Sequence, residues 1–276
     1  MVKIGAHQSI SGNYGNALSS VSKIGGNCLQ IFSTSPRGWN FAKITDQNIN
    51  DFIELKAQLK IEPVFFHASY LINLADNGRI GQLSKQSLKH ELNIASKLGI
   101  IGSIIHLGSY KKLLLDDRLS VLCNNIKEIL DNTPNNVFFI IENAGNKKIG
   151  QSIDEITKII NEVGNKKLAV CLDTCHLYSA GYDLSSEEKL TIFLDEFDSK
   201  IGLEKLKVFH LNDSKDPFNS GRDKHENIGA GTIPLKEFEL LLNHPKLQSM
   251  PFIIETPGFD QKGPDKKNID ILKGLL

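Results

Sequence analysis

The run Leu168-Ala-Val-Cys-Leu-Asp173 is apolar at every position until its last residue, a carboxylate, and Thr174-Cys-His176 follows at once. A strand of a parallel sheet that is covered on both faces has such a sequence, because side chains on both of its sides are buried. Functional residues in parallel barrels gather at the C-terminal ends of the strands. The position of Asp173 therefore indicates a functional site.

Short apolar runs of the same kind recur along all 276 residues of the chain. The eight runs are Lys3–His7, Cys28–Phe32, Pro63–His67, Gly102–His106, Val137–Glu142, Leu168–Asp173, Leu206–His210 and Pro251–Glu255. Segments with apolar residues at helical spacing separate them. The predicted helices are Asp46–Leu59, Ser84–Leu98, Ser152–Val163, Glu187–Phe197, Leu235–Leu242 and Asn268–Leu276.

This alternation of strands and helices predicts an α/β fold, a single (β/α)8 TIM barrel that spans residues 1–276. The alternative is an open, doubly wound sheet. That fold is disfavoured because no Gly-rich phosphate-binding loop follows the first apolar run.

Charge balance, cysteine spacing and the length of the apolar runs limit the class of protein to which the chain can belong. The chain has 32 basic and 32 acidic residues, which argues against a uniformly basic surface but leaves room for a local positive patch or bound cations. No C-x-x-C pair occurs among the four cysteines, and the first residues lead directly into a predicted strand. We therefore expect a cytoplasmic protein with reduced thiols; nuclear, organellar and viral settings stay open. No apolar run approaches the ~20 residues that span a membrane.

Side chains of metal-ligand type stand at or just after the ends of six of the predicted strands. They are His67, His106, Glu142, Asp173, His176, His210, Asp223, His225 and Glu255. Each one alone has an ordinary explanation as a hydrogen-bonded core residue. Together, four carboxylates in one dry cavity would repel each other strongly, and cations would remove that repulsion.

The mixture of imidazole and carboxylate ligands suits Zn²⁺, with Mn²⁺ or Fe²⁺ as alternatives. Nine ligands are too many for one tetrahedral ion, so we predict two or three ions with one carboxylate bridging a pair. Cys171 and Cys175 flank Asp173, and we interpret both as buried core thiols. His90 and His244 lie away from the strand ends and are assigned surface or capping roles.

Longer motifs surround these residues, in order, between about residues 3 and 258. They are Ile4-Gly-Ala-His-Gln-Ser9, His67-Ala-Ser-Tyr-Leu-Ile-Asn73, His106-Leu-Gly-Ser109, Ile141-Glu-Asn-Ala-Gly145, Ala169–His176, Phe209-His-Leu-Asn-Asp-Ser-Lys215 and Asp223-Lys-His225. Together they are similar to the signatures of the endonuclease IV family of abasic-site DNA endonucleases. The resemblance implies a zinc-dependent deoxyribonuclease on a TIM barrel.

The resemblance also implies a division of the ligands among three Zn²⁺ per chain, with Mn²⁺ as an alternative at one site. By position, the ions take His67, His106 and Glu142; Glu142, Asp173, His210 and Glu255; and His176, Asp223 and His225. In this assignment Glu142 bridges the first two ions. Glu142 and Glu255 are also the expected catalytic carboxylates.

The activity implied by the resemblance is hydrolysis of the phosphodiester 5′ to an abasic site, giving a 3′-hydroxyl and a 5′-deoxyribose phosphate. Cleaning of 3′ ends is an additional expected activity. The implied partner is double-stranded DNA with abasic sites. The resemblance also implies a monomer, and no membrane partner is expected. Family loops enter the minor groove at the lesion, and the matching residues are Arg37, Tyr70 and Leu71.

Without the resemblance, Arg37 would be read as an ordinary surface residue and Tyr70 as a half-buried core ring. Trp39 has two interpretations, as a support beneath Arg37 or as an anchor of its loop. The stretch Asn219–Arg222 departs from the family pattern, because Gly221 and Arg222 are displaced, and this leaves phosphate contacts from the loop in question.

Two other functions compete with DNA cleavage. A metal-dependent sugar isomerase or epimerase on a related barrel usually needs one or two ions. It would have little use for the pair Asp223 and His225, or for the exposed loops of Arg37 and of Tyr70–Leu71. A non-catalytic binder of damaged DNA would tolerate the loss of ligands. This sequence keeps all nine.

Overall fold

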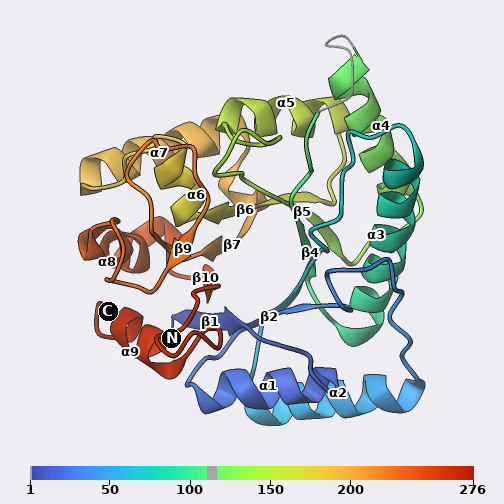
Figure 1. Ribbon diagram of the computed structural model, residues 1–276, viewed down its shortest axis with the longest axis horizontal. Coiled ribbons are helices and arrows are strands. Elements are labelled where there is room, and N and C mark those ends of the chain that lie inside the picture. Colours follow the sequence, from blue (N-terminus) through green and yellow to red (C-terminus); the bar gives the residue numbers. More distant parts are fainter. Residues whose placement is uncertain (1, 111–116) are drawn as a thin grey trace.

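The computed structural model describes residues 2–110 and 117–276, which form a closed barrel of parallel strands (Figure 1). Around the barrel the strands follow the order β1-β10-β7-β6-β5-β4-β3-β2. Their bounds are Lys3–His7 (β1), Leu29–Phe32 (β2), Val64–His67 (β3), Gly102–Ile105 (β4), Phe138–Glu142 (β5), Leu168–Asp173 (β6), Leu206–His210 (β7) and Pro251–Ile254 (β10). The predicted fold class is confirmed, and each of the predicted strands is present with ends within one residue of the prediction.

Helices cover the outside of the barrel, except for one short helix, Thr174–Ser179, that lies at the C-terminal ends of the strands. They are α1 (Tyr14–Lys23), α2 (Asp46–Leu59), α3 (Arg79–Leu98), α4 (Arg118–Asp131), α5 (Ile153–Val163), α6 (Thr174–Ser179), α7 (Glu187–Lys200), α8 (Leu235–Asn243) and α9 (Lys266–Lys273), with 3₁₀ turns at Leu203–Lys205 and Pro245–Leu247. In the described part of the chain, no helix combines the length and the apolar character that crossing a membrane requires.

Three helices, α1, α4 and α6, were not predicted. Helix α1 is rich in Ser and Asn, which have modest helix propensity, yet its buried residues Ala17, Leu18 and Val21 fix it against the barrel. Helix α3 begins at Arg79, five residues before the predicted start at Ser84. Ser152 is the N-cap of α5, and its side chain accepts a hydrogen bond from the Glu155 N–H.

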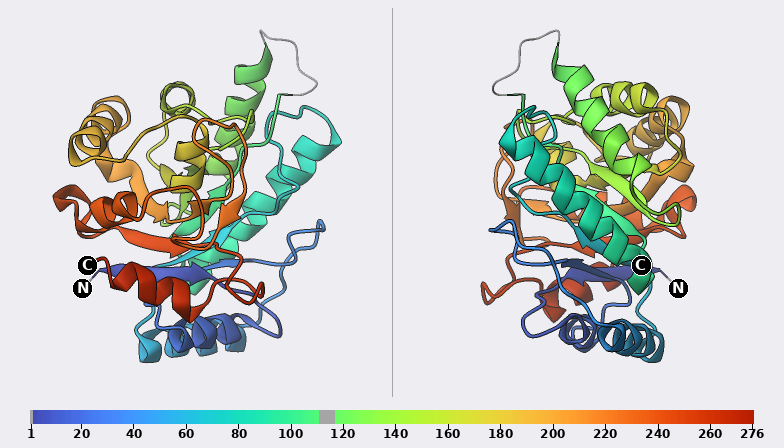
Figure 2. Two further views of the ribbon diagram at one scale, coloured as in Figure 1. Left: turned by 60° about the vertical axis from the view of Figure 1, so that its left-hand side comes forward. Right: turned by 90° about the vertical axis from the view of Figure 1, so that its right-hand side faces the viewer.

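Closure of the barrel joins the two ends of the chain. Strand β1 pairs in parallel with β10, with Ile4 opposite Phe252. The N- and C-terminal segments consequently lie side by side in every view (Figures 1 and 2), and α9 packs next to β1. The loops after β1 and β10 therefore meet at the same end of the barrel.

Each strand contributes to two apolar layers. Residues on one side of the strands fill the barrel interior, namely Cys28, Phe65, Ile104, Ile140, Ala169, Cys171, Val208 and Ile253. Residues on the other side pack beneath the helices in a larger cluster. Both sides of the strands are therefore buried, which explains why the strands read as continuous apolar runs.

A small antiparallel sheet follows β7. It pairs β8 (Asp213–Ser214) with β9 (His225–Glu226), so that Ser214 lies opposite His225. The Asp213 carboxylate accepts backbone hydrogen bonds from Gly229, Gly231 and Ile233, which fastens this hairpin to the chain that follows it. The sheet was not predicted, and it carries Asp223 and His225 toward the end of the barrel.

One charged side chain lies between a helix and the strands. Glu91 of α3 is 5% exposed, and its two carboxyl oxygens accept hydrogen bonds from the hydroxyls of Ser33 and Ser103. Burial raises the pKa of Glu91, and the hydrogen bonds from Ser103 and Ser33 oppose that rise. Folding therefore makes the protonated form of Glu91 easier to reach than it is in the unfolded chain.

Glu91 tests this packing through two substitutions. Glu91→Gln keeps the shape and the polar partners, so we expect a free energy of unfolding within about 1 kcal/mol of wild type near pH 5. Glu91→Ala opens a cavity and strands two buried hydroxyls, which should cost roughly 2–4 kcal/mol. Denaturant unfolding measures both, with Asn93→Ala on the exposed side of α3 as a control that should stay within about 0.5 kcal/mol.

The same variants give a pH dependence. A carboxyl whose pKa is raised by folding contributes stability that is full below its unfolded pKa of about 4.5 and is lost as the pH rises through the folded pKa. Gln does not titrate, so Glu91→Gln should gain stability relative to wild type as the pH rises above about 4.5. If the free energy of unfolding changed with pH in the same way in both proteins, Glu91 would have the same pKa in the folded and the unfolded chain.

Candidate metal centre

All nine predicted ligands lie together at the C-terminal end of the barrel. Their side-chain atoms form three groups, and the ligand atoms within each group lie within 4.8 Å of one another. The groups are His67, His106 and Glu142; Glu142, Asp173, His210 and Glu255; and His176, Asp223 and His225. This is the division that the sequence resemblance implies.

Glu142, the last residue of β5, connects the first two groups. Its Oε2 lies 3.1 Å from Nε2 of His67 and 3.3 Å from Nε2 of His106. Its Oε1 lies 3.2 Å from Nδ1 of His210. The two oxygens of one fully buried carboxylate therefore face separate groups, as a bridging carboxylate must.

The second group surrounds Nδ1 of His210, at the end of β7. This atom lies 3.4 Å from Oε2 of Glu255 and 3.7 Å from Oδ2 of Asp173. Asp173 and His210 are fully buried, whereas Glu255 borders a cavity of about 330 Å³ that opens above the cluster. The group is therefore enclosed on the barrel side and accessible on the loop side.

The third group combines helix α6 with the β8–β9 hairpin. Nε2 of His176 lies 3.0 Å from Oδ1 of Asp223, and Nε2 of His225 lies 3.6 Å from the same oxygen. Nε2 of His225 is buried and has no hydrogen-bond partner among the described residues. It lies 3.6 Å from Oδ2 of Asp173, too far for a hydrogen bond.

These separations fit a bound ion. Ligand atoms of a tetrahedral Zn²⁺ with bonds of roughly 2.0–2.2 Å lie roughly 3.3–3.6 Å apart. The gaps around His225 and His210 fall close to this range. A buried nitrogen without a hydrogen bond, flanked by two carboxylates, is satisfied when a cation lies between them.

The second nitrogen of most of these histidines is already fixed by an acceptor. Nδ1 of His67 donates to the carbonyl of Ala68 at 2.8 Å, and Nδ1 of His176 donates to that of Asn143 at 2.8 Å. Nε2 of His210 donates to Oε1 of Gln30 at 2.7 Å. These bonds select the tautomer that leaves the other nitrogen free to bind metal.

Among the protein groups alone, protons on histidines balance the negative charge of the ionised carboxylates. Burial alone would raise the pKa of Glu142, but the charges of His106 and His210 hold it well below its usual range. Burial also opposes ionisation of Asp223, yet the charge of His176 lowers its pKa to about 2. In return, burial lowers the pKa of His176 while Asp173 and Asp223 raise it, to a net value of about 10. Metal binding must displace such protons.

Sequence reasoning missed several residues that position the ligands. Gln30 of β2 is fully buried and donates from Nε2 to Oε1 of Glu255 at 2.5 Å, while its own Oε1 holds His210. Nδ1 of His7 lies 2.9 Å from the same Gln30 nitrogen. The signal for Gln30 was its polarity in the middle of an apolar strand.

Two asparagines perform the same task. Asn212 donates from Nδ2 to Oδ2 of Asp173 at 2.6 Å and accepts from the Glu255 N–H at 2.7 Å, so it links two ligands. Asn143 accepts the Asp173 N–H at 2.7 Å. Asn143 directly follows a ligand and Asn212 comes two residues after one, a proximity that could have identified both.

Both cysteines that flank Asp173 are buried, as predicted, and His90 and His244 each make a side-chain hydrogen bond to the backbone. Cys171 is buried in the barrel interior. Sγ of Cys175 could share an ion with Asp173 and His225, but burial raises the pKa of this thiol and Sγ donates to the Lys224 carbonyl. His244 caps the 3₁₀ turn at Pro245–Leu247, and Nε2 of His90 donates to the Ala42 carbonyl.

The predicted DNA-contact residues lie on two loops at the same end of the barrel. Tyr70 is 69% exposed, which excludes the half-buried core ring, and it stands edge-on to Phe32 above His67. Leu71 and Arg37 are also exposed. The Ser69 hydroxyl donates to the Pro36 carbonyl and thereby ties the Arg37 loop to the Tyr70 loop. Trp39 packs against the core and anchors its loop.

The loop that departs from the family pattern docks on helix α6. The N–H groups of Asn219 and Gly221 donate to the carbonyls of Tyr178 and Ser179. Arg222 pairs with Asp216 through Nη1 and Oδ1 at 3.2 Å. The loop is therefore held to α6, next to the third group, and its arginine is engaged within the loop.

Known proteins match this chain over nearly its whole length. Residues 18–275 match the family described as "Xylose isomerase-like TIM barrel". A relative from Persephonella marina, named "Probable endonuclease 4", is 38% identical over 100% of this chain and 98% of its own length. The crystal structure of endonuclease IV from Thermus thermophilus superposes with a TM-score of 0.86 at 29% identity and covers 99% of this chain and 98% of that one.

More distant barrels share only the fold. A D-tagatose 3-epimerase-like protein has a TM-score of 0.75 at 19% identity, over 99% of this chain and 97% of its own. By contrast, the likeness to "Probable endonuclease 4" extends over nearly the full length of both chains at more than 30% identity. The chain therefore belongs to the endonuclease IV family of xylose isomerase-like TIM barrels.

Proposed function

We propose that this protein is a DNA-repair endonuclease that hydrolyses the phosphodiester 5′ to abasic sites in double-stranded DNA, with three zinc ions per chain. The products are a 3′-hydroxyl and a 5′-deoxyribose phosphate. The observation that carries the proposal is the complete set of three ligand groups, of which Glu142 joins the first two. The name endonuclease 4 of the full-length relatives supports the reaction class.

Zn²⁺ bound in the three groups would neutralise phosphate charge and supply a nucleophile at neutral pH. Mn²⁺ at one site is compatible with the same nitrogen and oxygen donors. A blocking group joined to a 3′ oxygen through phosphate presents the same bond, so cleaning of 3′ ends belongs to the proposal. No thiolate is needed in this arrangement.

The side chains of the protein divide the work by position. Glu142 holds the first two groups at a fixed separation through its two oxygens. Glu255 is the carboxylate that borders the open cavity, and its Oε1 is oriented by Gln30. A carboxylate in that place can orient or accept a proton from the reacting water.

The exposed loop residues would recognise the lesion. A duplex that lacks one base has a gap in its stack, and an aromatic ring inserted there offsets the lost stacking. Tyr70 is suitable because it is exposed yet braced by Phe32, so its ring is already fixed above the cluster. Arg37, on the adjoining loop, would contact a phosphate.

The alternative, a sugar isomerase or epimerase, has the same barrel but a different need for ligands. It leaves the third group, His176, Asp223 and His225, without a task. The likeness to an epimerase-like protein is at 19% identity and concerns the fold alone. The third group therefore favours the nuclease.

The proposal is tested with a duplex that carries one abasic site. Metal-loaded protein should cut once, on the 5′ side of the lesion, and leave a 3′ end that a polymerase extends. Elemental analysis should find about three zinc ions per chain, and a strong chelator should abolish cutting until zinc is restored. An intact duplex after incubation with the fully loaded protein would refute the proposal.

Glu142→Gln tests the bridging role. The variant keeps the size of the side chain but removes its charge, so we expect kcat to fall by roughly 10²–10³-fold or more while much DNA binding persists. Zinc content should also fall, because Glu142 belongs to two groups. The control is Glu188→Gln on the outer helix α7, which should match wild type. Wild-type activity and zinc content in Glu142→Gln would contradict the assignment.

Tyr70→Ala tests recognition of the lesion. We expect the preference for abasic over intact duplex, measured as a ratio of Kd values, to fall roughly 5- to 150-fold, since aromatic stacking is worth about 1–3 kcal/mol. Tyr70→Phe keeps the ring and should keep the preference. The thermal unfolding midpoint should hardly change, because Tyr70 is exposed. An unchanged preference in Tyr70→Ala would assign the ring to another task.

A further inference from the structure

The loop that carries Arg37 comprises residues 33–45, between β2 and α2, and we call it the Arg37 loop. Within residues 33–45, all of which the structure describes, Ser33 alone is buried. Trp39 makes a partial contact with the core. A cavity of about 550 Å³ lies between the loop and helices α1 and α2, so little packing supports the loop from that side. The loop therefore depends on its hydrogen bonds for a fixed position.

Helix α3 fixes the start of the Arg37 loop. The Ser33 hydroxyl donates to one carboxyl oxygen of Glu91, and the hydroxyl of Ser103 in β4 donates to the other. The Ser33 carbonyl also accepts a hydrogen bond from the Tyr14 hydroxyl of α1. Because Ser33, Glu91 and Ser103 are buried, water does not compete for the bonds among them. The loop therefore leaves β2 from a fixed point.

The neighbouring residue of α3 fixes the loop again on the other side of Arg37. Nε2 of His90 donates to the Ala42 carbonyl at 2.7 Å. The His90 ring also lies beside the ring of Phe41, with the two centroids 5.0 Å apart. His90 is half-buried and Phe41 is exposed, so this contact lies at the surface. Two consecutive residues of one helix therefore hold the loop on both sides of Arg37.

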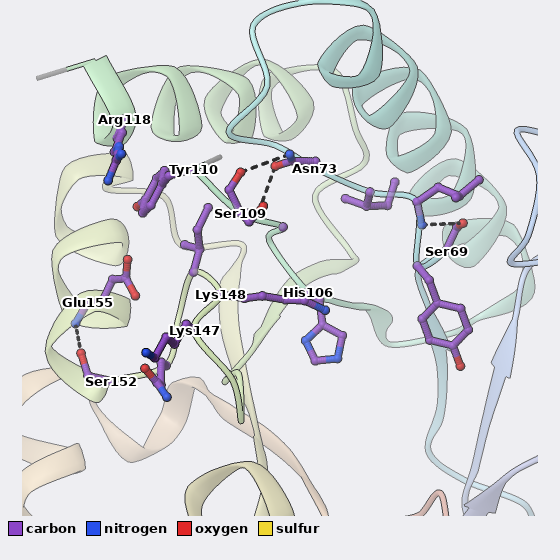
Figure 3. Close-up of a pocket in the computed structure, with 16 residues that line it drawn as sticks. Ser69, Asn73, His106, Ser109, Tyr110, Arg118, Lys147, Lys148, Ser152 and Glu155 are labelled. Atoms are coloured by element: carbon purple, nitrogen blue, oxygen red, sulfur yellow. Dashed lines mark hydrogen bonds between the residues drawn. The ribbon is translucent and has the colours of Figure 1, made fainter. Parts of the chain in front are cut away.

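A third hydrogen bond comes from the segment that leads into α3. The Ser69 hydroxyl donates to the carbonyl of Pro36, the residue before Arg37, at 2.7 Å. The same oxygen accepts the Leu71 N–H at 3.2 Å (Figure 3). Helix α3 and the segment before it therefore carry Tyr70 and Leu71 and also hold the loop of Arg37.

We infer that α3 positions Arg37 for the abasic site, with His90 and Glu91 as the positioning residues. The inference rests on the proposed function, and it concerns how the loop is ordered before the substrate arrives. An arginine on a loop that is already ordered loses less conformational freedom on binding. Loss of one of these hydrogen bonds should therefore weaken binding of the lesion and leave the chemical step unchanged.

A double-mutant cycle tests whether His90 acts through Arg37. Single-turnover cleavage of an abasic duplex is followed over a range of zinc-loaded protein concentrations, in wild type, His90→Ala, Arg37→Ala and the double variant. In His90→Ala we expect the half-saturating protein concentration to rise roughly 2- to 12-fold, because one hydrogen bond that orders the loop is lost. The maximal rate should stay close to that of wild type. In the Arg37→Ala background, His90→Ala should have little further effect.

Two results of the cycle would overturn the inference. An equal rise of the half-saturating concentration in both backgrounds would show that His90 acts on another part of the molecule. No rise in the wild-type background would show that the hydrogen bond to Ala42 does not order the loop for binding.

Conservative variants separate the hydrogen bond of His90 from its ring contact. His90→Gln keeps a side-chain N–H for the Ala42 carbonyl, so it should restore most of the wild-type half-saturating concentration. His90→Phe keeps a ring beside Phe41 but cannot donate, so it should behave like His90→Ala. Wild-type behaviour of His90→Phe would overturn the role of the hydrogen bond.

Ser33→Ala tests the Glu91 contact independently. The variant removes one donor while Glu91 keeps its hydrogen bond from Ser103. We expect the half-saturating concentration to rise in the wild-type background and to change little in the Arg37→Ala background. The matched control is Asn93→Ala on the exposed side of α3, which should match its parent protein in both backgrounds. Equal effects of Ser33→Ala in both backgrounds would reduce Glu91 to a structural residue and overturn its positioning role.

Failure of this inference is distinguishable from failure of the proposed function. If wild type does not cut abasic duplex, the proposed function fails. If wild type cuts but His90→Ala and Ser33→Ala have the same effects with and without Arg37, only the positioning inference fails. Zinc content should be the same in all of these proteins, because no variant touches a ligand.

Discussion

The arrangement of this protein depends on the compensation of charge at one end of a dry barrel. Glu142, Asp173 and His210 are completely buried there, with Glu255 at their edge. Carboxylates so close together are tolerable only if cations or protons lie between them. The pKa values of the carboxylates are lowered and that of His176 is raised, so among the protein groups alone protonated histidine supplies the positive charge. Bound metal ions would neutralise the carboxylates without added protons.

The barrel supplies the rigidity on which that compensation depends. Each ligand stands on a strand end or on an element tied to one. The polar residues Gln30, Asn143 and Asn212 fix ligand orientation from a neighbouring strand or from the residues just after one. Because these residues are buried, they cannot exchange partners with water. The apolar layers beneath explain why the cluster keeps its shape.

Around this rigid cluster the loops carry the surface toward the substrate. Tyr70 rises above the ligands, the β8–β9 hairpin brings His225 inward, and Gly145 lies directly against His176. The centre and its surroundings are thus built as one unit.

The sequence by itself determined the barrel and the identity of the nine clustered residues. Continuous apolar runs that end in His, Asp or Glu report double-sided burial and a polar strand end, and both are local properties. Helices α1 and α4 were not predicted, because the packing of residues such as Leu18 against the barrel stabilises them more than helix propensity does.

Only the tertiary structure decided which ligand oxygens and nitrogens face one another, as in the two sides of Glu142. It alone showed that Tyr70 is exposed and is not a core ring. The physical reason is that these relations link residues far apart in the chain, and closure of the barrel sets the distances between them.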